Sequence, residues 1–302
     1  MFFGPCFFPD GELYYRVLGL SFFYAALALA WNILALTGSI SIGHAAFFGL
    51  GAYTSALVSH YTQLSPLLCV ALGGASGMAY GITWYIVFKP LRGARYALAT
   101  LASVEIPRVI ADNWEGLTFG SLGLTGIRAL PDLRVGDVVL ALGGSLKSQY
   151  YFLLILMGIY GLIHHKAIHS RWGWAIRAVR EDETAAGTIG VPVDRIRLGA
   201  VMVSALLTAL CGAIYSHLMG LIEPSLVFSL HLSALPLVLS IFGGRYQFCG
   251  PILGSLALYP VDQLFFHSWF PSGHAALYGL VIILTFVLFP SGVGAWLQQR
   301  MR

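Results

Sequence analysis

Long apolar segments alternate with short polar breaks along almost the whole chain. The segments run about 17 to 25 residues, the length that a helix needs to cross roughly 30 Å of hydrocarbon. We therefore expect transmembrane helices at 17–36, 66–88, 96–111, 150–163, 198–221, 226–242, 250–266 and 275–290, with a further helix that starts near Ser41. That helix can either cross the membrane or re-enter it, so the pattern predicts eight or nine spans.

Composition changes this picture little. Of the 302 residues, 58% are hydrophobic and 10% are charged, which is more apolar surface than a soluble core can bury. We predict an all-α polytopic membrane protein with a single transmembrane domain over residues 1–302. The net charge of +4 comes from basic residues in short loops, where membrane topology places them, so we expect membrane lipid and no nucleic acid as a partner. The four cysteines are scattered and form no cluster with histidines, so we predict no metal site and no other cofactor.

The charges that do occur predict which side of the membrane each loop faces. Residues 164–197 hold six of the seventeen basic residues and four of the thirteen acidic ones, so this stretch is expected to be a water-exposed insertion between two spans. Its basic excess, like that of the loop at 89–95, predicts a cytoplasmic location. The longer stretch 112–149 is nearly neutral, which favours the exterior. Nine crossings would then place the N-terminus outside and the C-terminus inside.

The helix that starts near Ser41 carries small residues at helical spacing. They leave one face of the helix almost without side-chain bulk, which allows another backbone to approach closely inside a membrane. His44 lies on or near this face, where it either bonds a neighbouring helix or contacts a solute. We predict that the translocation path or close helix contacts involve Gly43, His44, Gly49 and Gly51.

One predicted span contains a charged pair. Glu105 and Arg108 are three residues apart around Pro107, so they share a helix face and can neutralise each other. We interpret them as a structural intramembrane pair, with a direct role in transport as the alternative.

These patterns bear on three classes of function: a membrane enzyme, an autonomous channel or secondary transporter, and a permease driven by a separate ATPase. Residues 271–274 read PSGH, a signature of membrane phosphatases, but no later His or Asp follows to complete that site. No P-loop or HExxH motif is present either, so we expect no enzyme activity in this chain. An autonomous channel or secondary transporter usually carries unpaired intramembrane acids. Here Glu105 has its own arginine, and that class leaves residues 164–197 unexplained.

A permease driven by a separate ATPase explains residues 164–197 best. The acids of Arg180-Glu181-Asp182-Glu183 suit the first turn of a helix, where the helix dipole favours negative charge. Ala185 and Ala186 then give a small, close-packing surface, and Gly187, Gly190 and Pro192 end the run. Such a short helix can protrude from the membrane and dock into a groove of a soluble partner.

These residues also carry a resemblance to a known family. The run Glu183-Thr-Ala185-Ala186-x3-Gly190, followed by Ile196-x-Leu198, resembles the EAA-type loop of ABC importer permeases. Together with the segments 43–57, 96–127, 171–191 and 243–251, it is similar to the branched-chain amino acid permease family of the LivM type. Two departures are the bulky residues 245–248 and His44, where the family also carries Gln.

The resemblance implies an importer of the bacterial inner membrane. It implies a periplasmic or lipid-anchored solute-binding protein, a second related permease and ABC ATPase subunits that use the ATP. It implies that the solutes are branched-chain or other small amino acids, with urea or short amides as the alternative. Contact with the ATPase would fall to Arg180, Glu183, Ala185, Ala186 and Gly190, with Arg180 at the rim.

Overall fold

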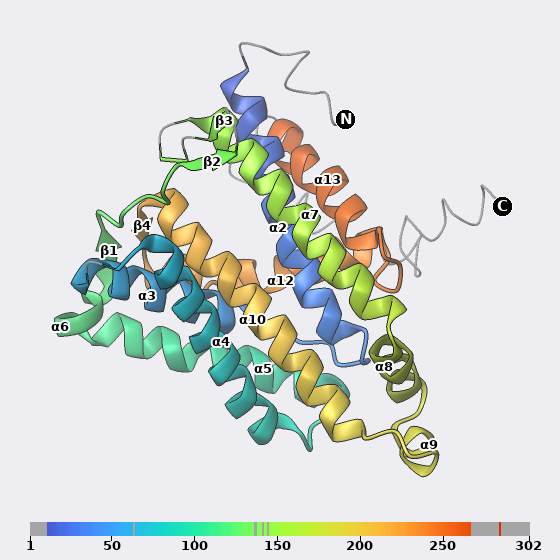
Figure 1. The fold of residues 1–302 in the computed structure, drawn as a ribbon. Coiled ribbons are helices and arrows are strands. Elements are labelled where there is room, and N and C mark those ends of the chain that lie inside the picture. The colour runs from blue at the N-terminus through green and yellow to red at the C-terminus, as the bar shows by residue number, and fades with distance from the viewer. Residues whose placement is uncertain are drawn as a thin grey trace. The chain divides into compact units, whose positions relative to one another are not determined.

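A computed structural model describes residues 11–62, 64–135, 138–140, 142–143, 145–266 and 284. Within these residues the chain is mainly helical (Figure 1). The longer helices are α2 (Glu12–Ala35), α3 (His44–Tyr61), α4 (Pro66–Phe88), α5 (Gly93–Asn113), α7 (Leu146–His169), α8 (Arg171–Glu181), α10 (Val193–Met219), α12 (Leu230–Gly243) and α13 (Gly250–Val261). The short ones are α6 (Glu115–Thr118), η1 (Gly120–Leu122), α9 (Glu183–Thr188), α11 (Pro224–Val227) and the π-helix η2 (Asp262–Phe266).

Five segments of the described chain are long and apolar enough to cross a membrane. They are Glu12–Ala35, Pro66–Phe88, Leu146–His169, Val193–Met219 and Pro224–Gly243. The expectation of an all-α polytopic membrane protein is therefore confirmed. The span expected at 250–266 differs, because α13 ends at Val261 and continues as η2. The span expected at 275–290 and the PSGH motif at 271–274 lie outside the described residues.

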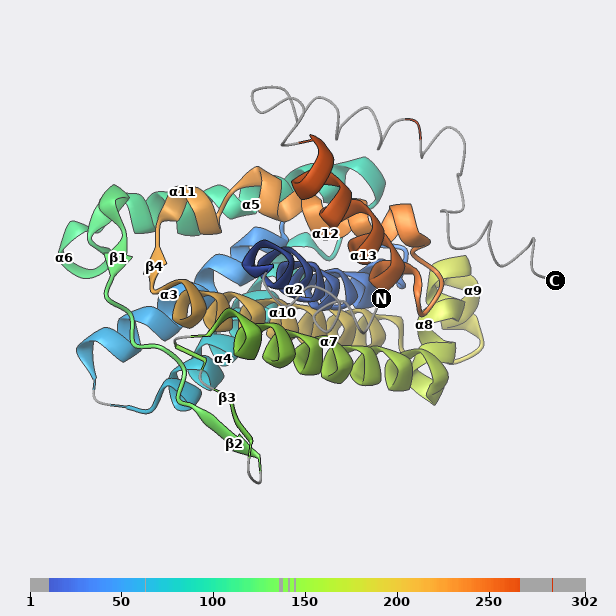
Figure 2. The same ribbon diagram turned by 90° about the horizontal axis from the view of Figure 1, so that it is seen from above.

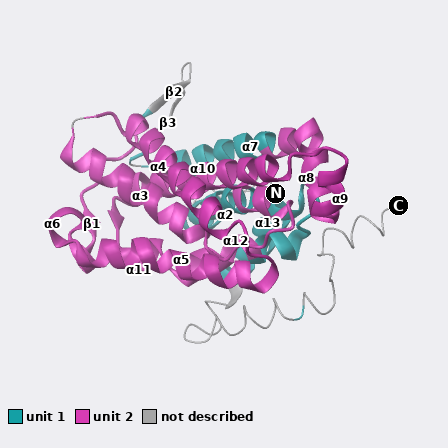
Figure 3. Ribbon diagram, turned by 90° about the horizontal axis from the view of Figure 1, so that it is seen from below, with its two compact units in different colours: residues 1–29, 132–163, 238–302 teal, residues 30–131, 164–237 magenta. Residues whose placement is uncertain are grey.

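The contacts divide the chain into two compact units (Figure 3). Unit 1 comprises residues 1–29, 132–163 and 238–302, and unit 2 comprises residues 30–131 and 164–237. The helices α2, α7 and α12 contribute residues to both units. Unit 2 contains the whole of α3, α4, α5, α8, α9 and α10. The candidate residues for ATPase contact, for the path and for the charged pair all lie in it.

Three helices of unit 2, α3, α4 and α10, pack along one another with little space between their backbones (Figures 1 and 2). A Cβ atom at Gly51 of α3 would meet the carbonyl oxygen of Ala209 in α10, and one at Gly212 of α10 would meet the carbonyl oxygen of Phe48. Close approach of this kind is how small residues hold membrane helices together. These three helices form the best-packed part of the unit.

In unit 1, an aromatic cluster joins α2 to α7 and α13. The ring of Tyr150 lies 5.9 Å from that of Tyr15 and 5.3 Å from that of Phe22, while Tyr24 lies 4.7 Å from Tyr259. The turn between α12 and α13 is equally tight. A Cβ atom at Gly243 would meet the carbonyl oxygen of Gly250, which explains the pair of glycines at this turn.

The stretch expected as a loop at 112–149 contains short elements of its own. Strand β1 (Leu124–Thr125) pairs antiparallel with β4 (Leu221–Ile222), the strand that follows α10. Strands β2 (Leu133–Val135) and β3 (Val138–Leu140) form a second antiparallel pair. The β1–β4 pair bears more on the candidate functional site described below, because it connects the segment after α5 to the end of α10.

Candidate functional site

The segment between α7 and α10 is shorter than the sequence suggested. Residues 164–169 continue α7, and His164 is fully buried with its Nε2 2.9 Å from the side-chain oxygen of Asn32. The expectation that the whole stretch from residue 164 is a water-exposed insertion is therefore wrong at its beginning. The independent elements of the segment are α8 and α9.

Helix α8 begins at a side-chain cap and packs by one face. The Ser170 hydroxyl accepts the N–H of Gly173, as expected for a serine at the N-cap. Ile176 and Val179 are buried, whereas Trp174 on the other face is exposed with the Arg177 guanidinium 4.4 Å from its ring centre. This amphipathic pattern fixes which side of α8 meets the rest of unit 2.

Asp182 separates α8 from α9. Its backbone ends α8, and its Oδ1 accepts hydrogen bonds from the N–H groups of Thr184 at 2.8 Å and Ala185 at 2.9 Å. The expected helical run from Arg180 is therefore broken by one residue, with Arg180 in the last turn of α8 and Glu183 in the first turn of α9. Asp182 prefers the cap because its carboxylate satisfies amide groups that a helix start leaves without partners.

Helix α9 ends in a left-handed turn, as the glycines predicted. Gly190 has φ +88°, its N–H donates to the carbonyl of Gly187, and the N–H of Val191 donates to the carbonyl of Ala186 at 3.0 Å. This is the Schellman pattern, in which a glycine adopts a conformation that costs other residues free energy. The helix is thus fixed at both ends by local hydrogen bonds.

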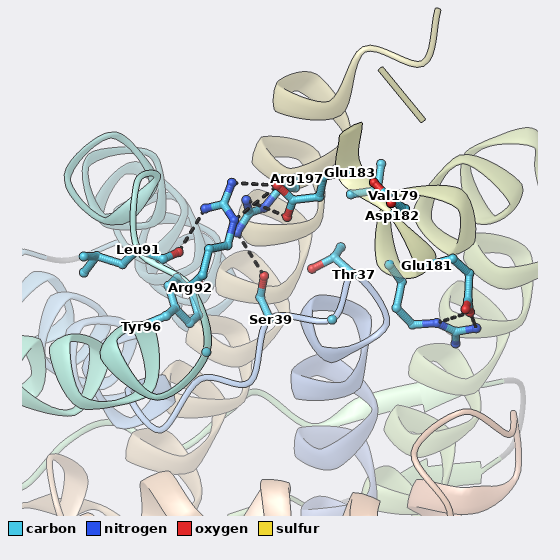
Figure 4. A pocket seen from close by; sticks show the side chains of 13 residues that line it. Thr37, Ser39, Leu91, Arg92, Tyr96, Val179, Glu181, Asp182, Glu183 and Arg197 are labelled. Atoms are coloured by element: carbon cyan, nitrogen blue, oxygen red, sulfur yellow. Dashed lines mark hydrogen bonds and ion pairs between the residues drawn. The ribbon is translucent and has the colours of Figure 1, made fainter. Parts of the chain in front are cut away.

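Glu183 turns inward from α9 and meets two arginines from other helices (Figure 4). Its Oε2 lies 2.7 Å from Nη2 and 3.2 Å from Nε of Arg92, in the loop before α5. Its Oε1 lies 3.0 Å from Nη1 of Arg197 in α10. The second amino group of Arg197 donates to the Ser39 hydroxyl at 3.2 Å, so one carboxylate connects α9 to three separate parts of unit 2.

The same residues line a cavity of about 150 Å³ (Figure 4). Arg197 is 5% exposed, and a charge that is so deeply buried needs a partner because water cannot solvate it. Glu183 provides that partner and Ser39 takes one further N–H. The two contacts use different amino groups of the guanidinium fork, a geometry that the single nitrogen of a lysine does not reproduce.

The other residues predicted for ATPase contact lie in different surroundings. Ala186 is buried at 3% exposure, whereas Ala185 and Gly190 are exposed. Arg180 pairs with Glu181, with its Nε 3.0 Å from Oε1. Ile189, which the sequence reasoning did not single out, is 77% exposed directly after α9. The exposed surface of α9 therefore combines Ala185 and Ile189, while Ala186 and Glu183 hold the helix in place.

The predicted path residues lie at the start of α3, in contact with neighbouring helices. His44 is buried, with Nε2 2.8 Å from the Ser204 hydroxyl and Nδ1 3.2 Å from that of Ser41. A Cβ atom at Gly43 would meet the carbonyl oxygen of Thr100, and one at Gly49 would meet the ring of Phe228. These positions, like Gly51 above, are at close helix contacts within unit 2.

The charged pair of α5 is formed but is not buried. Arg108 Nη1 lies 3.2 Å from Glu105 Oε1, and Arg108 Nε lies 3.7 Å from Asp112 Oδ2. The side chains of Glu105 and Arg108 are 58% and 39% exposed. The two side chains therefore pair on one face of α5, and both are partly exposed in the single chain.

Arg92, Arg197 and Ser39 are site residues that sequence reasoning missed. Arg197 does carry a signal, because it stands where the apolar segment of α10 begins and an arginine there needs a partner. Arg92 and Ser39 carry none that identifies Glu183, since they lie 91 residues and 144 residues away in sequence. Only the fold brings them together.

Comparison with known proteins places the chain in a family context. Residues 13–288 match the family model described as branched-chain amino acid transport system, permease component. The chain is 27% identical over 257 residues to the high-affinity branched-chain amino acid transport system permease protein LivM of Escherichia coli K12, covering 79% of this chain and 60% of LivM. It thus spans about three fifths of the length of that relative.

Two further relatives have similar identity. The permease protein LivH of the same organism is 23% identical over 285 residues, covering 89% of this chain and 90% of LivH. The autoinducer 2 import system permease protein LsrC of Enterobacter sp. 638 is 25% identical over 275 residues, covering 83% of this chain and 72% of LsrC. No solved structure gives a significant match.

Proposed function

Because this chain belongs to the family of permease components of branched-chain amino acid transport systems, we propose that it is a membrane-spanning subunit of an ABC importer. It would move branched-chain or other small amino acids into a bacterial cell. A solute-binding protein outside the membrane, a second related permease and two ATPase subunits would complete the transporter. The chain itself would hold no cofactor and perform no hydrolysis.

The observation that carries this proposal is the construction of the α8–α9 element. Helix α9 has an exposed surface around Ala185 and Ile189, and its inward carboxylate is bonded to arginines on two other elements. A helix that only connected two spans would need neither feature. An ATPase that displaces α9 would instead act on the loop before α5 and on α10 at the same time, through Glu183.

The proposed orientation follows from the same element. The docking surface must face the compartment that contains ATP, so α8, α9 and the loop before α5 would be cytoplasmic. Basic residues at 89–95 and in α8 agree with this side. The solute is supported only by the names of the relatives, and LsrC shows that related permeases serve import systems for other solutes.

Two variants of α9 test the proposal. Ile189→Asp should abolish recovery of the ATPase with the affinity-purified chain, because it puts a charge in the centre of the docking surface. The control is Leu122→Asp in η1, which changes another highly exposed apolar residue and should leave recovery unchanged. Equal recovery from both variants would contradict the docking role of α9.

The second variant separates docking from force transfer. Glu183→Gln keeps the size of the side chain but removes the charge that Arg92 and Arg197 share, so ATPase should still be recovered while amino acid uptake per ATP hydrolysed falls about tenfold. Glu181→Gln is the control, because the ion pair that Glu181 forms in the described part of the chain is with its neighbour Arg180. Uptake of radiolabelled leucine into proteoliposomes that contain the whole transporter is the measurement. An unchanged ratio would contradict force transfer through Glu183.

A further inference from the structure

One face of helix α5 packs against neither the α8–α9 element nor the helices α3, α4 and α10. A proline stands inside this helix, and Pro107 has no N–H to donate to the carbonyl of Ser103 four residues earlier. The Tyr80 hydroxyl of α4 donates to that carbonyl at 2.9 Å. In addition, the Trp84 ring N–H donates to the Ser103 hydroxyl at 2.8 Å. These two bonds fix which face of α5 turns toward α4.

The opposite face of α5 is exposed. On the packed side the buried residues are Tyr96, Thr100, Ser103, Val104, Pro107 and Ala111. The other side carries four exposed residues that share one face of the helix, Leu98, Glu105, Ile106 and Val109. Of these, Ile106 is 60% exposed. We call these four residues the outer face of α5.

This face lies level with the apolar segment of α4. Tyr80 is within the apolar segment Pro66–Phe88, roughly 12 Å from its end at Phe88 if each residue adds about 1.5 Å. Glu105 lies two residues beyond Ser103, whose carbonyl Tyr80 contacts, so it is roughly 15 Å from that end of the segment. A hydrocarbon core is about 30 Å thick, which would place the carboxylate of Glu105 near its middle.

A carboxylate at that depth is costly to expose to lipid, and the surrounding charges do not remove the cost. Arg108 is the basic partner of both Glu105 and Asp112, so the three side chains carry an excess of one negative charge. Ionisable groups in membrane helices face a protein interior or a water-filled cavity. Yet the side chain of Glu105 is 58% exposed in this chain.

We propose that the outer face of α5 lines the water-filled path of the solute. In a water-filled path, water would solvate the excess carboxylate. At a protein interface, only a cation from the partner could neutralise its charge. The face also suits an aliphatic amino acid, because the negative charge attracts its ammonium group and Ile106 and Val109 are compatible with its apolar side chain. The amino acid part of this inference rests on the proposed function, whereas the water-filled path does not.

Cysteine accessibility in the assembled transporter tests this assignment. Cys6, Cys69, Cys211 and Cys249 are first replaced by alanine, and single cysteines are then introduced as Ile106→Cys and Val109→Cys. The matched control is Leu72→Cys, an exposed apolar position of α4 within the segment Pro66–Phe88. A charged, membrane-impermeant maleimide is applied to membrane vesicles, and labelling is followed by mass spectrometry.

We expect the two α5 cysteines to react at least tenfold faster than the α4 control, because the thiolate that reacts forms in water and not in lipid. Saturating leucine should slow their labelling several-fold. Labelling of α5 at the rate of the control would overturn the water-filled path, as would disulfide cross-linking of these cysteines to the second permease without labelling. Fast labelling that leucine does not slow would overturn the amino acid part, and would leave the path itself supported.

Discussion

Two regions of unit 2 differ in how closely their helices pack. In the α3–α4–α10 core, helix backbones touch, and glycines such as Gly51 and Gly212 leave no room for even one more carbon atom. In α9 and its C-terminal turn, a Cβ atom added at Gly187 or Gly190 would meet nothing within 4 Å. The core is held by many short-range contacts that cannot be adjusted. Helix α9 is held by one buried alanine, by the caps at its two ends and by one carboxylate.

The difference explains how one chain can be both rigid and responsive. Packing at close range makes α3, α4 and α10 respond as a body, because a small shift of one helix would overlap the next. Ionic contacts such as those of Glu183 tolerate shifts of a few tenths of an ångström and still transmit attraction. The element that we propose meets the ATPase is therefore more loosely held than the core.

The largest effect should come from filling the core. Gly212→Ala would place a Cβ atom against the carbonyl oxygen of Phe48, a backbone atom that cannot turn aside. We expect the free energy of unfolding to fall by about 3 kcal/mol, at the upper end of typical overpacking costs. Thermal unfolding of the purified chain in mild detergent measures this. A stability equal to wild type would show that α3 and α10 can separate, contrary to the comparison above.

A smaller loss is expected where the two regions meet. Arg197→Met keeps an unbranched apolar stem but leaves Glu183 with Arg92 alone, and it removes the bond to Ser39. Because Glu183 is partly exposed and keeps one partner, the free energy of unfolding should fall by about 2 kcal/mol, less than for a fully buried pair. Arg197→Lys should recover less than half of the loss, since lysine is shorter and lacks the two separate amino groups that reach Glu183 and Ser39.

Loss of the cap between the helices should cost less again. Asp182→Ala removes the acceptor of two N–H groups at the start of α9, which typically costs about 1 kcal/mol. Amide hydrogen exchange should rise in residues 183–188 and stay unchanged in α3. Faster exchange in α3 as well would mean that the two regions unfold together and would remove the distinction between them.

The smallest change should have the opposite sign. Gly187→Ala makes the same substitution as in the core, but within α9 and with open space around it. Alanine restricts the unfolded chain more than glycine does, so the free energy of unfolding should rise by about 0.5 kcal/mol. A decrease measured in the same thermal assay would contradict the open space around Gly187.

Periodicity and length were enough to predict most of the fold. The limits expected for the span at 66–88 coincide with those of α4, because apolar residues end there at a proline and at a lysine. The limits of α5 and α7 were placed too far inward, since their polar ends continue the helix outside the apolar segment. At His164 the pattern failed for a physical reason: a polar side chain can be buried when one partner such as Asn32 accepts or donates a bond.

The candidate site was predictable in its composition but not in its arrangement. The acids, alanines and glycines of 180–190 indicated a short helix with an end at Gly190, and that helix is present. Ala186 and Ala185 look equivalent in sequence, yet only Ala186 is buried. The inward direction of Glu183 depends on Arg92 and Arg197, and tertiary partners of this kind leave no local pattern.

The bond from Tyr80 to Ser103 has a consequence for motion. Since the tyrosine hydroxyl replaces the donor that Pro107 lacks, turning α5 about its own axis would leave a carbonyl without a partner inside the membrane. Helix α5 therefore stays tied to α4, and through α4 to the α3–α4–α10 core. Arg92 lies in the connection between α4 and α5 and bonds Glu183, so a displacement of α9 would be passed to the outer face of α5 together with the core.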